Sequence, residues 1–226
     1  MEIKAILIDI DNTLLDFDKS ANKASYNVAE KYGISLPDNY TGVFHKVNDE
    51  LWTSLQRGDI VKTDIYKMRF RKIFEILSIN TDCDKFEEDF RKELREIAEP
   101  VEGAEEILKY LSAKYPVYTA SNASRFQQEV RLKKSGLWQY LSGMFTSEEI
   151  GFQKPAREFF TACHKELYPL SASGIMMIGD SISADITGAK NYGINTIWYN
   201  YKGEVFDDYG FTDYYVNSLY EIKDIL

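Results

Sequence analysis

The first residues in this chain that suggest chemistry are two aspartates separated by a single residue. Asp9 lies near the end of the apolar run Ile3–Ile10, Asp11 comes directly after that run, and Thr13 follows two positions later. A carboxylate can attack phosphorus and form an aspartyl phosphate. A second carboxylate nearby can protonate a leaving alkoxide and later remove a proton from water. Such a pair could therefore cleave a phosphate ester.

Other polar residues follow later apolar runs in the same way. Ser121 and Asn122 end one run, Lys154 lies in a loop before a proline, and Asp180 and Asp185 follow another run. Each has an ordinary structural explanation: a lysine before proline is usually a solvated charge, and aspartates at the start of a helix cap it or favour its dipole. Those explanations do not account for the occurrence of all these residues in order at predicted strand ends.

The four aspartates, brought together with one lysine, would repel one another unless a cation lay among them. With only two histidines and two widely spaced cysteines, the chain offers no nitrogen or thiolate site. Carboxylate ligands completed by water suit Mg²⁺. The carboxylates therefore predict a magnesium site. Mg²⁺ and Lys154 would neutralise a phosphoryl group, to which Ser121 and loop amides would donate hydrogen bonds.

A parallel sheet would bring these remote residues to one edge. Short β-branched runs predict strands, and amphipathic patterns between them predict helices. The expected strands are residues 3–10, 117–121, 144–147, 175–178 and 194–199. The expected helices of this part are residues 104–114, 126–135, 158–167 and 184–192. The alternation indicates an α/β fold, a doubly wound, Rossmann-like parallel sheet whose ligands bind at the carboxyl ends of the strands.

The alternation stops between the first strand and about residue 100, where the sequence predicts helices only. They are residues 19–32, 40–56, 63–77 and 86–97. We therefore expect a catalytic core of residues 1–15 and 100–226 with an inserted helical cap of residues 16–99. The core can recognise only phosphate, so the cap is expected to close over it and read the leaving group. Gln56 and Arg57, beside a turn at Gly58, are candidate substrate-binding residues, although Arg57 could also be merely solvated.

Composition narrows the class of partner. The formal net charge is -9, from 27 basic and 36 acidic residues, so a nucleic-acid polymer would be repelled and a small phosphorylated metabolite is expected instead. No apolar run approaches the roughly 20 residues that span a bilayer, and the N-terminal run, interrupted by Asp9, does not resemble a signal peptide. We expect a cytoplasmic protein with reduced thiols. Its oligomeric state is not readable from the sequence.

The motifs resemble those of the haloacid dehalogenase-like hydrolase superfamily over nearly the whole chain. The matching positions are the D-x-D-x-T residues, a serine that ends a strand, a lysine, and the motif G-D-x-x-x-x-D; they are Asp9, Asp11, Thr13, Ser121, Lys154, Gly179, Asp180 and Asp185. The presence of Asp11 favours phosphate ester cleavage, because the dehalogenases of the superfamily lack an aspartate at that position.

The resemblance implies a role for each aspartate. Asp9 would be the nucleophile and a metal ligand. Asp11 would be the general acid and base, and would offer its backbone carbonyl to the metal. Asp180 would be a metal ligand, and Asp185 would support the metal directly or through water. Thr13 and Asn122 are further candidate substrate-binding residues.

A closer resemblance points to a substrate class. Asn12 stands where many relatives have glycine, and residues 179–200, with the ending Trp198-Tyr199-Asn200, look like the branch that contains house-cleaning pyrimidine 5'-nucleotidases. This implies a nucleoside 5'-monophosphate as the substrate. A sugar-phosphate phosphatase or phosphosugar mutase of the same superfamily is the alternative enzyme. A catalytically silent binding protein would be expected to have lost Asp9, Asp11 or Lys154.

Overall fold

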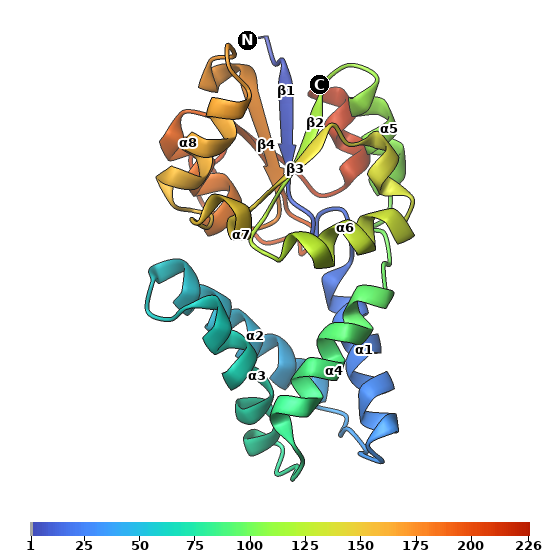
Figure 1. Cartoon of the computed structure of the whole chain (residues 1–226). Coiled ribbons are helices and arrows are strands. Elements are labelled where there is room, and N and C mark those ends of the chain that lie inside the picture. Colours follow the sequence, from blue (N-terminus) through green and yellow to red (C-terminus); the bar gives the residue numbers. More distant parts are fainter. Residues whose placement is uncertain (1) are drawn as a thin grey trace. The chain divides into compact units, whose positions relative to one another are not determined.

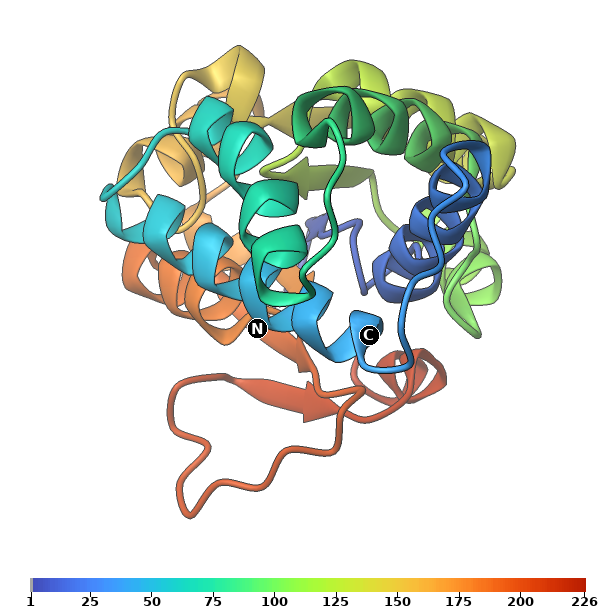
Figure 2. The same cartoon turned by 90° about the horizontal axis from the view of Figure 1, so that it is seen from below.

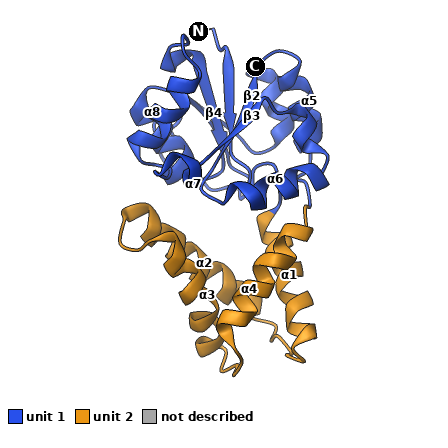
Figure 3. Cartoon of the chain, viewed as in Figure 1, with its two compact units in different colours: residues 1–16, 99–226 blue, residues 17–98 orange. Residues whose placement is uncertain are grey.

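The structure is a computed structural model, and it describes residues 2–226 of the chain. Two compact units are distinguished in it, residues 1–16 with 99–226 and residues 17–98 (Figure 3). The chain leaves the first unit at Asp16 and returns at Glu99. Within the first unit these two residues are neighbours, because the Asp16 N–H donates a 2.8 Å hydrogen bond to the Glu99 carbonyl. The second unit is therefore an insertion into the first.

A six-stranded parallel sheet forms the centre of the first unit (Figure 1). Its order is β3-β2-β1-β4-β5-β6, and every neighbouring pair is parallel. The strands are β1 (Ala5–Ile8), β2 (Val117–Ser121), β3 (Gly143–Thr146), β4 (Ile175–Gly179), β5 (Asn195–Tyr199) and β6 (Tyr214–Val216). The chain winds outward from β1 to β3 and then crosses to β4, so β1 and β4 flank the point where a doubly wound sheet binds ligands.

Helices cover both faces of this sheet because its strands are apolar on both sides. Ile6 and Ile8 of β1 belong to one apolar core, and Ala5 and Leu7 belong to another on the opposite face. The first core contains α5 (Ala104–Ser112) and part of α6 (Arg125–Lys134), and the second contains α8 (Arg157–Glu166) and α9 (Gly188–Tyr192). In Figure 1, α5 and α8 lie on opposite sides of the strands. The predicted α/β fold class is confirmed.

Two local features differ from expectation. Strand β6 had no apolar signal, because it has three residues and two of them are exposed. The helix expected at 184–192 is a π-helical segment, η3 (Ile182–Thr187), followed by α9. The stretch between β5 and β6 is a long loop that stands out from the edge of the sheet (Figure 2). The aromatic rings of this loop pack against one another and against Trp198 of β5, which contacts Phe206 and Phe211.

The second unit is all-helical, as predicted. Within residues 17–98 its helices are α1 (Phe17–Lys31), α2 (Tyr40–Arg57), α3 (Lys62–Ile76) and α4 (Cys83–Glu96). Their apolar faces meet in one core, which also contains a buried ion pair. Arg69 Nη2 lies 2.5 Å from Glu87 Oε1, and the guanidinium lies over the ring of Phe90. A further bond from Arg69 to Asn48 ties α2, α3 and α4 together.

The remaining expectations concern thiols and membranes. Neither cysteine forms a disulfide; Cys83 is partly buried and Cys163 is buried. None of the helices in residues 2–226 has both the length and the apolar character needed to cross a bilayer. The shorter helical segments of the first unit are α7 (Ser147–Ile150), η1 (Leu137–Tyr140), η2 (Ala172–Gly174) and η4 (Leu219–Asp224).

Candidate active site

Asp9 is the first residue after β1 and is held by the sheet. Its N–H donates a 2.8 Å hydrogen bond to the carbonyl of Ile178 on β4. The chain then turns sharply, and Asn12 has the left-handed φ of 61°. Asparagine tolerates this conformation better than most residues do. The turn is closed by the Asn12 N–H, which donates to the Leu15 carbonyl at 2.7 Å.

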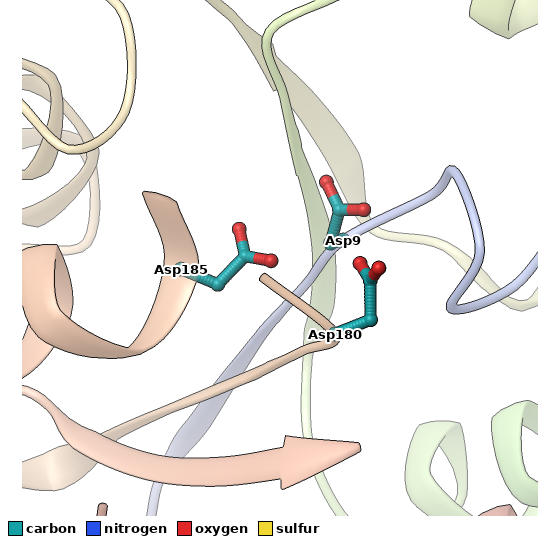
Figure 4. A group of neighbouring side chains, drawn as sticks. All are labelled: Asp9, Asp180 and Asp185. Atoms are coloured by element: carbon teal, nitrogen blue, oxygen red, sulfur yellow. The ribbon is translucent and has the colours of Figure 1, made fainter. Parts of the chain in front are cut away.

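Three of the four predicted aspartates gather at the carboxyl edge of the sheet. Asp9, Asp180 and Asp185 each place a carboxylate oxygen within 4.8 Å of the others (Figure 4). Asp9 and Asp185 are buried and Asp180 is partly buried. Asp9 follows β1, Asp180 follows β4, and Asp185 comes from η3. The buried Thr13 donates a 3.4 Å hydrogen bond to Asp180, so it contacts a carboxylate of the cluster.

Lys154 supplies the positive charge at this edge. Its ammonium lies 2.6 Å from an oxygen of Asp9 and 2.6 Å from an oxygen of Asp185. It also donates to the carbonyl of Ala120 at 2.6 Å. An ammonium has three protons, so these three bonds fix its position. The side chain is only 3% exposed, which removes the reading of Lys154 as a solvated loop charge.

Asp185 fits against the sheet because residue 179 is glycine. A Cβ at Gly179 would lie 2.3 Å from an oxygen of Asp185, a distance that real atoms do not adopt. One oxygen of Asp185 accepts from Lys154, and the other accepts from the Ser181 N–H at 3.1 Å. Both oxygens of this carboxylate thus have protein partners.

The charges of the cluster are not balanced by its one lysine. Burial raises the pKa of Asp9 to about 7; Lys154 opposes this shift, while Asp185 and Asp11 add to it. Burial and the charges of Asp9 and Asp185 raise the pKa of Asp180 well above its ordinary value. Burial alone would lower the pKa of Lys154, but the charges of Asp185 and Asp9 raise it above its ordinary value. An acidic site with these properties could bind a metal ion.

Ser121 and Asn122 lie beside the cluster at the end of β2. The buried Ser121 hydroxyl accepts a 3.1 Å hydrogen bond from the Ala123 N–H. The side-chain amide of Asn122 bonds to the Lys154 backbone twice, accepting from its N–H at 2.8 Å and donating to its carbonyl at 2.9 Å. Asn122 therefore positions the loop that carries Lys154, a task that the sequence did not predict.

The side chain of Asp11 lies outside the three-carboxylate group. Its two oxygens accept from Arg131 and from Gln128, each at 2.5 Å. Both donors are on α6, and sequence reasoning did not single them out. The available signal was their i, i+3 spacing on a helix that follows the Ser121 strand end directly, which places both on one helix face.

The two candidate residues of the second unit lie at the end of α2. Arg57 is exposed, and its Nε lies 2.9 Å from Asp59. Gln56 is partly buried. A role for either residue in binding substrate stays a prediction.

Comparison with known proteins agrees with the motifs that meet at this edge. The sequence matches the haloacid dehalogenase-like hydrolase family over residues 3–193, which is most of the chain. The chain belongs to that family. The expectation of an enzyme of the phosphatase kind is thereby confirmed, and a silent binding protein is not favoured, since Asp9, Asp11 and Lys154 are all present.

Individual relatives within the family add detail. The chain is 32% identical to the pyrimidine 5'-nucleotidase PynA of Streptococcus pneumoniae over 201 residues, covering 88% of this chain and 85% of PynA. It is 28% identical to the pyrimidine 5'-nucleotidase YjjG of Escherichia coli over 221 residues, covering 98% of this chain and 96% of YjjG. The fold matches a magnesium-bound crystal structure of the hydrolase YfnB from Bacillus subtilis with a TM-score of 0.93. The two sequences are 27% identical, and the match covers 100% of this chain and 99% of the YfnB chain.

Proposed function

We propose that this haloacid dehalogenase-like hydrolase is a Mg²⁺-dependent phosphomonoesterase that works through an aspartyl phosphate on Asp9, with a nucleoside 5'-monophosphate as its substrate. The observation that carries the proposal is the contact of Lys154 with Asp9 inside a group of three carboxylates. This arrangement can hold a phosphoryl group against a nucleophile that would otherwise repel it.

The donor set fits magnesium. Its side-chain ligands are carboxylates alone, and three of them surround one lysine. Burial, together with the neighbouring carboxylates, raises the pKa values of Asp9 and Asp180, and a bound cation would oppose that shift. Asp9 and Asp180 would hold the ion, together with the backbone carbonyl of Asp11. Since both oxygens of Asp185 have protein partners, Asp185 would act through water. When bound, Mg²⁺ neutralises phosphoryl oxygens and keeps the neighbouring carboxylates ionised.

In the first half of the reaction, a carboxylate oxygen of Asp9 forms a bond to phosphorus as the bond to the ester oxygen breaks. Asp11 gives its proton to the leaving alkoxide, so that a neutral alcohol departs. Lys154, fixed by its three hydrogen bonds, and the Ser121 hydroxyl stabilise the charge on the transferring group.

In the second half, Asp11 takes a proton from a water molecule, and the water oxygen attacks phosphorus. The bond between phosphorus and Asp9 breaks, and inorganic phosphate and the Asp9 carboxylate are released. Asp11 is then protonated and ready for the next substrate. The same side chain thus serves as acid and as base, which requires it to reach both the leaving oxygen and the water.

Removal of the metal is expected to abolish turnover. Protein treated with EDTA should regain activity with Mg²⁺ and not with Ca²⁺, because Ca²⁺ prefers more ligands at longer distances. Mg²⁺ should also raise the Tm of the metal-free protein, because it binds the folded state. The Asp180→Asn variant should need a higher Mg²⁺ concentration for both effects. Full activity in metal-free buffer would contradict the magnesium site.

The substrate class is testable with a panel of phosphate esters. The proposal predicts the highest kcat/KM for pyrimidine nucleoside 5'-monophosphates, and its support is the similarity to PynA and YjjG. Sugar phosphates and p-nitrophenyl phosphate complete the panel, and release of inorganic phosphate is measured throughout. A preference for sugar phosphates, or return of the phosphoryl group to a sugar, would favour the alternative enzyme and overturn the nucleotidase assignment.

A further inference from the structure

Helix α6 has two buried polar side chains on the face that meets the catalytic edge. Gln128 and Arg131 are both fully buried, at 0% exposure. They are three residues apart, so they stand one turn from each other on the same side of the helix. Nothing in the reaction described above uses either residue.

The two side chains hold the carboxylate of Asp11 from both ends. Arg131 Nη1 donates to Oδ1 at 2.5 Å, and Gln128 Nε2 donates to Oδ2 at 2.5 Å. Arg131 Nη1 also donates a 3.0 Å hydrogen bond to Gln128 Oε1, so the two side chains hold each other in position. Short hydrogen bonds to a charged group are the strong ones.

Gln128 also reaches the other side of the site. Its Nε2 lies 3.2 Å from the hydroxyl oxygen of Ser121. One amide group therefore contacts both the residue proposed to handle protons and the residue proposed to hold phosphate. The relative position of Asp11 and Ser121 is fixed through this side chain.

A structural role alone explains this arrangement poorly. Burying a guanidinium costs free energy, and apolar residues of similar size often stabilise a fold as well or better. Here the buried cation is paired with a carboxylate that is 28% exposed and lies on the loop after β1. The pair thus orients a carboxylate that shares the donor Gln128 with Ser121, and in a catalytic site a small displacement of such a group lowers the rate by a large factor.

We propose that Gln128 and Arg131 are positioning residues that fix the Asp11 carboxylate for proton transfer and keep its position relative to Ser121 constant. This inference rests on the proposed function, because it assumes that Asp11 is the general acid and base. It predicts that loosening either contact impairs the step that needs Asp11 more than any other step.

The test compares esters with poor and good leaving groups. Gln128→Met is expected to lower kcat for an alkyl phosphate by roughly 10- to 100-fold, the cost of a misplaced catalytic group. Release of nitrophenol from p-nitrophenyl phosphate in a single turnover should slow much less, because nitrophenolate leaves with little protonation, whereas the later attack of water is common to both esters. The affinity for both esters should stay nearly unchanged. Gln127→Met, a neighbouring glutamine of α6 outside this set of contacts, is the matched control and should resemble the parent.

A second variant separates a loss of positioning from a loss of folding. Arg131→Lys keeps the buried charge but loses the planar guanidinium, and it should show the same leaving-group dependence at a retained Tm. An equal loss in the single-turnover rates of both esters from Gln128→Met and Arg131→Lys would reduce the two residues to a structural role. Faster turnover of the alkyl ester would mean that they hold Asp11 out of action, which also overturns the proposal.

The Asp11→Asn background separates this inference from the function on which it rests. In that background Gln128→Met should have little further effect, because the group it positions is already disabled. If Asp11→Asn itself slows the single turnover of both esters equally, the acid role of Asp11 fails. If Asp11→Asn shows the leaving-group dependence and Gln128→Met adds its full loss on top, the acid role stands and the positioning role fails.

Discussion

Asp9→Asn is expected to abolish turnover and to leave the fold intact. Only a carboxylate oxygen can form the acyl phosphate, and loss of a nucleophile of this kind removes on the order of 10⁴-fold or more of the rate. Asparagine has nearly the same shape, and Asp185 remains to pair with Lys154. Steady-state hydrolysis of p-nitrophenyl phosphate measures the loss, and circular dichroism with a thermal melt checks the fold.

Two further variants make that result interpretable. Asp9→Ala cannot regain a carboxylate by deamidation, so residual activity shared by both Asp9 variants would be real. Asp207→Asn makes the same change at an exposed aspartate outside the three-carboxylate group and should behave like the parent. Turnover near the parent rate in both Asp9 variants would remove Asp9 from the role of nucleophile.

Asp11→Asn is expected to give the second largest loss, on the order of 10²- to 10⁴-fold for an alkyl phosphate. The asparagine side chain can still accept a hydrogen bond from Arg131, so its position should be retained, while its ability to give and take a proton is lost. The loss should be smaller for p-nitrophenyl phosphate in the first half of the reaction. Rapid mixing should therefore show a burst of nitrophenol followed by slow release of phosphate.

That burst distinguishes the two duties of Asp11. If nitrophenol and phosphate appear together, with no burst, the slow step is not the attack of water on the phosphoenzyme. An equal loss for alkyl and nitrophenyl esters in single-turnover experiments would argue against leaving-group protonation by Asp11.

The sequence was sufficient to predict five of the six strands and the aspartates and lysine at their ends. Short apolar runs were followed by polar residues, and parallel strands place their carboxyl ends at one edge of the sheet. Residues that are far apart in the sequence therefore lie close together there. Asp9, Asp180 and Lys154 meet for this reason, since β1 and β4 are neighbours and Lys154 is held by Asn122 from the end of β2. The reason for glycine at position 179 comes from the structure, because the carboxylate of Asp185 occupies the space that a side chain would need.

The contacts of Asp11 could not be predicted in this way. Helical periodicity indicates that Gln128 and Arg131 share a face of α6. An amphipathic pattern assigns arginine and glutamine to the solvent side of a helix, so it does not predict that these two are buried. Which residue they meet depends on the turn after β1, and that turn is set by the left-handed backbone of Asn12. Long-range side-chain pairing of this kind has no local signal.

The most direct measurement of the central claim is the identification of the phosphorylated residue. The Asp11→Asn variant is mixed with p-nitrophenyl phosphate and Mg²⁺, quenched in acid within the burst, and reduced with borohydride, which converts an acyl phosphate of aspartate to homoserine. Peptide mass spectrometry then locates the change. We predict homoserine at position 9 and at no other aspartate, in an amount that matches the nitrophenol burst. A full burst without modified Asp9, or modification at Asp180 instead, would contradict the assignment of Asp9 as the nucleophile.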